Sequence, residues 1–181
     1  MTESSREIEK GDLFKDAMEL ALYVILLIII LCCIKTMFFE IAVVKGTSMN
    51  DTLQDGDMLL VNVKAFRRYD EDCFSYGDIL IVRYPDRKER FIKRLVGKPG
   101  DKIEIKDGTL YRNDEPVEED YIKGYMKGTY GPFYIDDEHY FVLGDNRNNS
   151  NDSRSVGSLP WDYIVGKAEF RFYPFRSFTR F

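Results

Sequence analysis

The sequence has few of the residues on which most metal sites and many catalytic mechanisms depend. Its 181 residues include one histidine, His139, and three cysteines. A histidine-rich metal site and any mechanism that needs two histidines are therefore excluded. Cys73 is the only cysteine outside a long apolar run, so the rest of the chain cannot close an internal disulfide. Positive charge is not in excess either. Because the formal net charge is −5, nucleic acid is not the expected partner.

One part of the chain lacks charge altogether. Residues 20–34 contain no charged side chain, and the apolar stretch continues past Lys35 to Phe39. Twenty helical residues span about 30 Å, the thickness of the hydrocarbon core of a bilayer. A cleaved signal peptide would have a short basic start and a small-residue cleavage site, and a core helix is rarely apolar on every side. The run therefore predicts a transmembrane helix over residues 20–39, preceded by a stub of residues 1–19. The lysines and arginines on its two sides do not decide its orientation.

From residue 40 onward the pattern changes from helix to strand. The clearest hairpin joins residues 102–106 to residues 109–112 through Asp107-Gly108. Strands are expected at 40–44, 57–63, 79–84, 91–96, 102–106, 109–112, 140–143 and 167–173. Such short strands between frequent turns indicate a mainly β fold, an antiparallel barrel or sandwich. Residues 113–137 are expected to form a surface loop or flap. Because the β domain follows the anchor without a linker, it is expected to lie against the bilayer surface.

Two residues of this domain could act together in catalysis. Ser48 lies in a Gly-containing loop after a strand, where open backbone N–H groups could stabilise an oxyanion. By itself this segment is more typical of an ordinary turn. Lys93 falls between Phe91 and Leu95 on the apolar face of an expected strand. Burial would lower the pKa of its ammonium group and make it a general base. By itself this segment is more typical of a lysine whose stem lies on the sheet while its head reaches solvent.

A third segment, residues 144–157, is rich in Asp, Asn, Ser and Arg. A calcium loop would need more acidic residues at fixed spacing. The interleaved acids and arginines instead favour ion pairs within the loop, holding an irregular structure near a site. His139 precedes an expected strand and is expected to be structural, so a Ser-His-Asp triad is not favoured. A serine can instead be activated by a neutral lysine.

Four segments in order resemble the conserved boxes of type I signal peptidases. They are Ser48-Met49-x-x-Thr52-Leu53, Gly77-Asp78, Ile92-Lys93-Arg94-x-x-Gly97-x-Pro99-Gly100-Asp101, and Gly144-Asp145-Asn146-Arg147-x-x-Ser150-x-Asp152-Ser153-Arg154-x-x-Gly157. The anchor before the first box and the segment 166–171 match as well. The resemblance extends over most of the chain, and it is to the compact bacterial members with a single anchor.

The resemblance implies a membrane-bound serine endopeptidase that removes signal peptides from exported preproteins after small residues. Ser48 would be its nucleophile and Lys93 its general base, and no cofactor or metal is implied. The backbone N–H of Ser48 would donate to the oxyanion. The hydroxyl of Ser150 would hydrogen-bond to Lys93 and orient it.

The resemblance also implies supporting roles. Asp152 would shape the site together with Arg154, and Met49 would pack under the substrate cleft. Two positions depart from the family pattern. Asp51 stands where the family usually has proline, which brings a negative charge near the cleft. Gly46 stands where some members have a hydroxyl that assists the oxyanion hole, so a second oxyanion donor is not identified.

The resemblance further implies a location and partners. The family acts on the outer side of the bacterial plasma membrane, which predicts a single-pass protein with a cytoplasmic stub and an extracytoplasmic catalytic domain over residues 40–181. The expected partners are the lipid bilayer, the secretion translocon and signal peptides bound in extended form by strand addition. Two alternatives remain open. One is a specialised Ser-Lys peptidase with one or few substrates, and the other is an inert membrane-tethered β domain.

Overall fold

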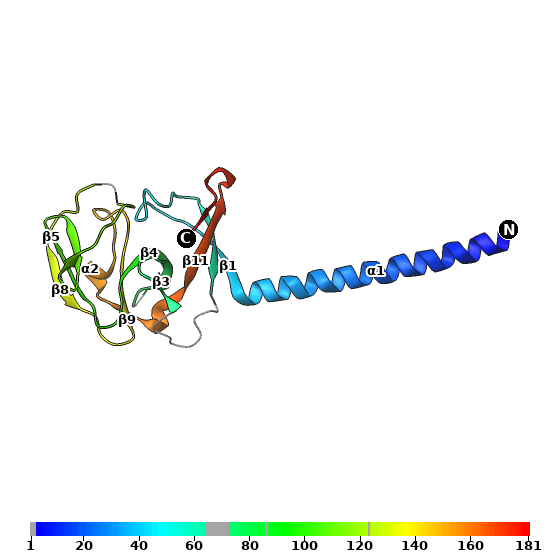
Figure 1. The fold of residues 1–181 in the computed structure, drawn as a ribbon, viewed down its shortest axis with the longest axis horizontal. Coiled ribbons are helices and arrows are strands. Elements are labelled where there is room, and N and C mark those ends of the chain that lie inside the picture. Colours follow the sequence, from blue (N-terminus) through cyan, green and yellow to red (C-terminus); the bar gives the residue numbers. More distant parts are fainter. Residues whose placement is uncertain (1–2, 64–72, 86, 123) are drawn as a thin grey trace. The chain divides into compact units, whose positions relative to one another are not determined.

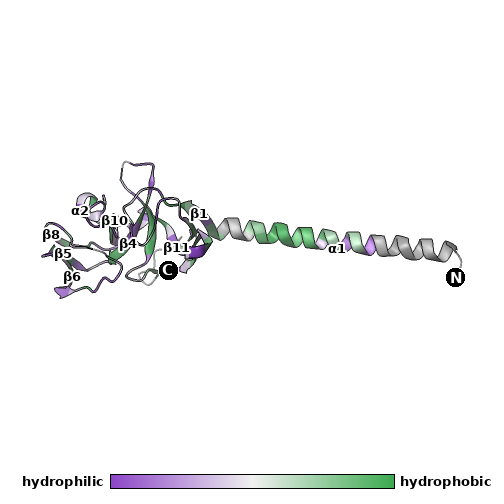
Figure 2. Ribbon diagram, turned by 90° about the horizontal axis from the view of Figure 1, so that it is seen from above, coloured by the Kyte–Doolittle hydropathy of each residue, from purple (hydrophilic) through white to green (hydrophobic). Residues whose placement is uncertain are grey.

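The computed structural model describes residues 3–63, 73–85, 87–122 and 124–181, and the chain divides into two units at Phe38/Phe39. The first unit contains helix α1 (Glu3–Phe38) (Figure 1). Its stretch Lys15–Cys33 is long and apolar enough to cross a membrane. Figure 2 shows most of this stretch in green, the colour of hydrophobic residues. Every amide of a helix is satisfied within the segment, so such a stretch can enter a bilayer without exposing backbone polar groups.

The second unit is built on antiparallel strands, which confirms the predicted mainly β fold class. Among the described residues, the larger sheet has eight strands in the order β1-β2-β11-β3-β4-β9-β10, and β12 pairs with β11. Its strands are β1 (Phe39–Val43), β2 (Met58–Asn62), β3 (Ile79–Arg83), β4 (Arg90–Gly97), β9 (His139–Leu143), β10 (Leu159–Pro160), β11 (Ile164–Tyr173) and β12 (Thr179–Arg180). The described residues of this part also form a short helix α2 (Ser153–Val156) and the 3₁₀ turns η2 (Trp161–Tyr163) and η3 (Phe175–Ser177).

A smaller sheet corrects one prediction. Its four described strands run in the order β7-β6-β5-β8 and are β5 (Lys102–Lys106), β6 (Thr109–Arg112), β7 (Glu115–Pro116) and β8 (Tyr130–Tyr134). Strands β7 and β8 lie within residues 113–137, which were expected to be a loop. The sequence of β8 hides the strand because Gly131 and Pro132 interrupt it. Tertiary packing compensates, since Phe133 packs against Phe141 of the larger sheet with ring centroids 5.0 Å apart.

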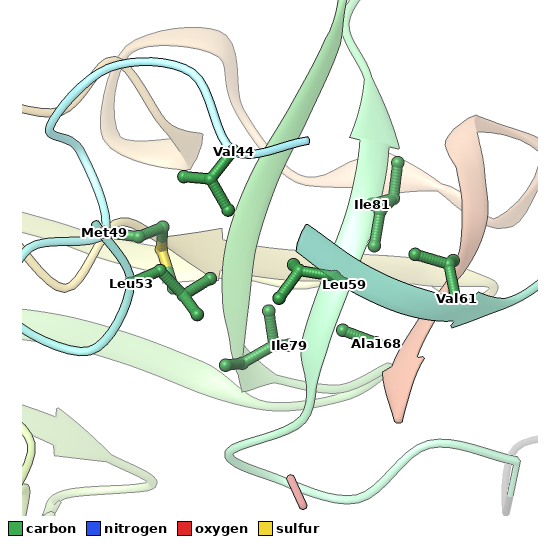
Figure 3. Packing of buried hydrophobic residues seen from close by; sticks show 8 residues of the cluster. All are labelled: Val44, Met49, Leu53, Leu59, Val61, Ile79, Ile81 and Ala168. Carbon is green, nitrogen blue, oxygen red and sulfur yellow. The ribbon is translucent and has the colours of Figure 1, made fainter. Parts of the chain in front are cut away.

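A hydrophobic cluster lies under the loop that joins β1 to β2 (Figure 3). Its buried members are Val44, Met49, Leu53, Leu59, Val61, Ile79, Ile81 and Ala168. Met49 and Leu53 come from the loop itself and are almost completely buried. Burial of side chains of this size contributes about 1.5–3 kcal/mol each. The cluster therefore fixes the loop that carries Ser48 to the strands of the larger sheet.

Two strand edges close to the Ser48 loop have no neighbour among the described residues. Strand β1 pairs with β2 on one side only. Strand β4 pairs with β3 along Arg90–Arg94, whereas its pairing with β9 begins only at Arg94. A cavity of about 180 Å³ is lined by residues of both edges, including Ala42 and Ile92. The two free edges therefore face a common groove.

Candidate active site

Ser48 is half-buried in the loop between β1 and β2. Tight local hydrogen bonds shape this loop: the Asn50 N–H donates to the Thr47 carbonyl at 3.1 Å, and the Leu53 N–H donates to the Met49 carbonyl at 2.9 Å. The Ser48 carbonyl accepts a hydrogen bond from the backbone N–H of Asn146 at 3.0 Å. The backbone of Ser48 is therefore held both by its own loop and by the segment that follows β9.

Lys93 lies in the middle of β4 and is 2% exposed. Its Nζ donates a hydrogen bond to Ser48 Oγ at 2.7 Å. Burial lowers the pKa of Lys93 from 10.5 to about 8, although the carboxylates of Asp152 and Asp145 oppose this shift; the charge of Arg154 adds to it. A measurable fraction of the amine is therefore neutral at neutral pH, and it lies in contact with a hydroxyl.

Asp152 and Arg154 lie together beside this pair. The Asp152 carboxylate is fully buried and accepts from Arg154 Nε at 2.8 Å and from Arg154 Nη2 at 2.9 Å. It also accepts from the Gly144 N–H at 3.0 Å and caps the start of α2. One carboxylate thus joins the end of β9 to α2 and contributes negative charge near Lys93.

Ser150 lies close to the Ser48 backbone but makes no hydrogen bond to Lys93. Its Oγ is buried and has no hydrogen-bond partner among the described residues. A Cβ atom added to Gly144 would come within 2.2 Å of Ser150 Oγ and 2.5 Å of the Ser48 carbonyl oxygen. The glycine therefore allows Ser150 and Ser48 to approach each other, and Ser150 keeps a hydroxyl that is free to donate.

The ion pairs of residues 144–157 are only partly internal, which corrects the sequence-based expectation. Asp152 pairs with Arg154 inside the loop, but Asp145 pairs with Arg94 of β4, with Nη2–Oδ2 at 2.7 Å. Arg147 pairs outside the loop as well, with Glu119 at 2.6 Å. The two outside partners lie on separate segments, so this loop is fastened to its surroundings from two sides.

The backbone at Ser48 offers an open donor. The Ser48 N–H donates no hydrogen bond to a described residue. The neighbouring Gly46 N–H is already used, since it donates to Asp55 Oδ1 at 2.7 Å. An open N–H beside a hydroxyl is the arrangement that stabilises a developing oxyanion. Gly46 can serve as a second donor only if the contact to Asp55 breaks.

A small cavity of about 100 Å³ opens next to the pair. Ser48 and Lys93 line it together with the apolar side chains of Val44, Met49 and Ile92. It is the smaller of the two cavities that Val43 and Ile92 both line. Met49 forms part of its wall and is also a member of the buried cluster, so the shape of the cavity depends on the packing of the core.

Several residues that complete the site were given no role from sequence, although Thr52 and Asn146 stand in the boxes quoted above. Thr52 Oγ1 donates to Asp145 Oδ2 at 2.6 Å, and the side-chain amides of Asn146 and Asn149 donate to Thr47. Thr52, Asn146 and Asn149 lie within the two segments that begin at Ser48 and at Gly144. Their polar side chains in these segments were the signal that could have identified them. The single histidine, by contrast, contacts the Asp137 carbonyl and is not part of this group.

Comparison with known proteins identifies the family. The model of the family described as signal peptidase, peptidase S26, matches residues 17–173. The chain belongs to this family. It is 35% identical to signal peptidase I of Bacillus licheniformis over 99% of both chains. It is also 38% identical to signal peptidase I T of Bacillus subtilis (84% of this chain and 83% of the relative) and 37% identical to signal peptidase IB of Staphylococcus aureus (75% and 78%). The candidate site, which pairs the Ser48 hydroxyl with the buried amine of Lys93, is consistent with a hydrolase of this family.

Proposed function

We propose that this protein is a membrane-bound serine endopeptidase that removes N-terminal signal peptides from exported preproteins. The observation that carries this proposal is the 2.7 Å contact between Ser48 Oγ and the buried amine of Lys93. Serine is a poor nucleophile until a base accepts its proton. Since no histidine or carboxylate contacts Ser48 Oγ among the described residues, Lys93 is the group that can do so.

The reaction is an acyl transfer with Ser48 as nucleophile. Neutral Lys93 accepts the hydroxyl proton as Ser48 Oγ attacks the scissile carbonyl, and the Ser48 N–H donates to the oxyanion. The ammonium then gives its proton to the leaving amine, and a water activated by Lys93 hydrolyses the acyl-enzyme. Ser150, whose hydroxyl has no hydrogen-bond partner among the described residues, would orient Lys93 by accepting an N–H of the amine, which leaves the Nζ lone pair for the Ser48 proton. Asp152, held by Arg154, sets the position of the segment that carries Ser150.

The substrate binds in extended form in the groove between β1 and β4. Both strands have free edges there, and an unpaired edge can hydrogen-bond to an added strand. The cavities of about 100 and 180 Å³ open from the same groove, and both are lined by Val43 and Ile92. Alternate side chains of an extended peptide point the same way, so two of them can fill these cavities. The smaller cavity, at Ser48, receives the residue before the cleaved bond, which the resemblance to type I signal peptidases implies is small.

The apolar helix α1 anchors the protein in the plasma membrane, with the N-terminus in the cytoplasm and the β unit outside. This location supplies a substrate that is itself membrane-bound, so anchoring raises the local concentration of signal peptides. A specialised enzyme with few substrates would use the same residues. An inert β domain is disfavoured, because burying a lysine beside a serine costs stability without any structural return.

Cleavage of a preprotein with an Ala-x-Ala site tests the proposal directly. The full-length protein in detergent is expected to cut after the second alanine, and mass spectrometry of the product identifies the bond. Replacing that alanine by phenylalanine is expected to lower kcat/KM at least ~100-fold, because the resemblance to type I signal peptidases implies cleavage after small residues. Cleavage that persists in Ser48→Ala protein would contradict the proposal.

The pH dependence of cleavage is expected to follow Lys93. The amine must be neutral to accept a proton, so kcat/KM should rise with pH and level off above a pKa of about 8. Below that value it should fall about tenfold for each pH unit. Initial rates between pH 6 and 10 measure this. A plateau that extends down to pH 6 would show that another group is the base.

A further inference from the structure

A segment far from Ser48 in sequence contacts the site from its outer side. This bracing segment, residues 119–122 and 124–127, lies between the strands β7 and β8 of the smaller sheet. Its Glu119 carboxylate accepts from both Nη atoms of Arg147, at 2.8 and 2.6 Å. The two side chains are 7% and 1% exposed, so this bidentate pair is desolvated. Arg147 Nε in turn donates to the Gly144 carbonyl at 3.0 Å.

The bracing segment makes a second contact with the site through Tyr121. The Arg94 guanidinium lies 3.9 Å from the centre of the Tyr121 ring, which is a cation–π contact. Arg94 also donates to both carboxylate oxygens of Asp145 and to the Gly77 carbonyl. The Tyr121 ring and Asp145 together hold the Arg94 side chain in place. Arg94 directly follows Lys93, the candidate base, in β4.

The same segment exchanges two hydrogen bonds with the loop after β9. The Asn148 side-chain amide donates to the Tyr125 carbonyl at 2.8 Å and accepts from the Lys127 N–H at 3.0 Å. The loop after β9 is also the one whose Asn146 N–H donates to the Ser48 carbonyl. A continuous series of contacts therefore runs from the bracing segment, through residues 144–148, to the backbone of Ser48.

We propose that Glu119 and Tyr121 are positioning residues, which hold the Ser48 loop and the charges around Lys93 in place through Arg147 and Arg94. This inference rests on the proposed peptidase function. It assigns a role to a segment outside the four sequence boxes. Both residues act indirectly: Glu119 binds Arg147, and Tyr121 contacts Arg94.

The charges that face Lys93 make this role measurable. They are the carboxylates of Asp152 and Asp145, which favour its charged form, and the guanidinium of Arg154, which disfavours it. Arg94 neutralises Asp145 as long as Tyr121 and the ion-paired loop keep the two together. When Arg94 moves away, the uncompensated Asp145 charge stabilises the ammonium and raises the pKa of Lys93. The acid limb of the rate profile then shifts to higher pH.

The test compares four variants of the full-length protein in detergent. Glu119→Gln keeps the shape of the side chain but removes its charge, and Tyr121→Leu removes the ring over Arg94. Each is expected to lower kcat about 10–100-fold at pH 7 while KM changes less than about threefold, because misplacement of reacting groups acts on the chemical step. In both, the apparent pKa of the acid limb is expected to rise by at least about half a pH unit.

Two variants serve as controls. Tyr121→Phe keeps the ring and loses only the hydroxyl that donates to Glu119, so it should stay within about threefold of the wild-type kcat. Glu118→Gln changes the same residue type at an exposed neighbouring position and should change neither kcat nor the pH profile. If Glu119→Gln fails to fold, the comparison of Tyr121→Leu with Tyr121→Phe still tests whether the ring over Arg94 has a positioning role.

Wild-type rates and an unshifted acid limb in Glu119→Gln and Tyr121→Leu would overturn the inference. So would a fall in rate that is matched by the loss of folded protein, with no change in the pH profile of the remainder. Ser48→Ala protein, assayed in parallel, separates this result from a failure of the proposed function. If Ser48→Ala is inactive while Glu119→Gln is fully active, only the positioning role is wrong.

Discussion

Replacing Lys93 by methionine is expected to abolish cleavage and, at neutral pH, to stabilise the folded protein. Methionine has a similar length but cannot accept the Ser48 proton, so kcat/KM should fall by at least about 10³-fold. Lys93→Arg should be equally inactive, because a guanidinium stays charged at any accessible pH. Initial cleavage rates measured at pH 8.5, where the wild-type amine is mostly neutral, provide the comparison.

The gain in stability follows from the lowered pKa of Lys93. The folded protein holds this proton with a pKa of about 8, whereas the ordinary value is 10.5. The unfolded chain therefore binds the proton more tightly, and protonation favours unfolding. The cost is complete below pH 8, declines between pH 8 and 10.5, and vanishes above. At ~1.36 kcal/mol per pH unit it amounts to about 3 kcal/mol at pH 7.

Thermal unfolding of the full-length protein in detergent, followed by near-ultraviolet circular dichroism, measures this effect. The Lys93→Met variant should unfold at a higher temperature than wild type at pH 7, and the difference should shrink as pH rises toward 10. Lys88→Met, at an exposed position of the same hairpin, should change neither activity nor this pH dependence. A lower unfolding temperature for Lys93→Met at pH 7 would show that Asp152 and Asp145 compensate the buried charge fully.

Local sequence placed Lys93 on an apolar strand face, but it established neither the burial of the amine nor the partner of the amine. The alternation Phe91-Lys93-Leu95 puts the lysine on an apolar face, but by itself this pattern favours an amine that reaches solvent; in the structure the amine is buried. Strand alternation says nothing about which loop covers that face. Ser48 lies 45 positions earlier in the chain, and only the resemblance to a family linked the two residues in advance.

The role of the bracing segment could not be predicted from the sequence. Around Glu119 the chain reads Val-Glu-Glu-Asp-Tyr, a composition typical of a solvated loop. One of these acids is buried only because Arg147, 28 positions later, is brought against it by the folded sheets. The strand β8 escaped prediction for a related reason. Its Gly131 and Pro132 oppose strand formation locally, and the packing of Phe133 against Phe141 outweighs them.

The second large effect is expected from Gly144→Ala. A Cβ at this position would lie 2.2 Å from Ser150 Oγ and 2.5 Å from the Ser48 carbonyl oxygen, and real Cβ contacts are not that short. Ser150 can rotate away, but the Ser48 carbonyl can retreat only if its backbone moves. Since the carbonyl is held by Asn146, such a shift displaces the nucleophile from Lys93. Displacements of about 1 Å can cost about 100-fold in rate, so kcat should fall by at least that factor.

A double variant identifies which of the two clashes matters. Gly144→Ala combined with Ser150→Gly removes the collision with the Ser150 side chain and leaves the collision with the Ser48 carbonyl. It should therefore be no more active than Gly144→Ala. Ser150→Gly alone measures how much of the rate is lost when the Ser150 hydroxyl is removed. Circular dichroism spectra should show that each variant is folded. If the double variant recovers the rate of Ser150→Gly, the Ser48 backbone tolerates the added methyl group, and the close approach at Gly144 serves Ser150 rather than the nucleophile.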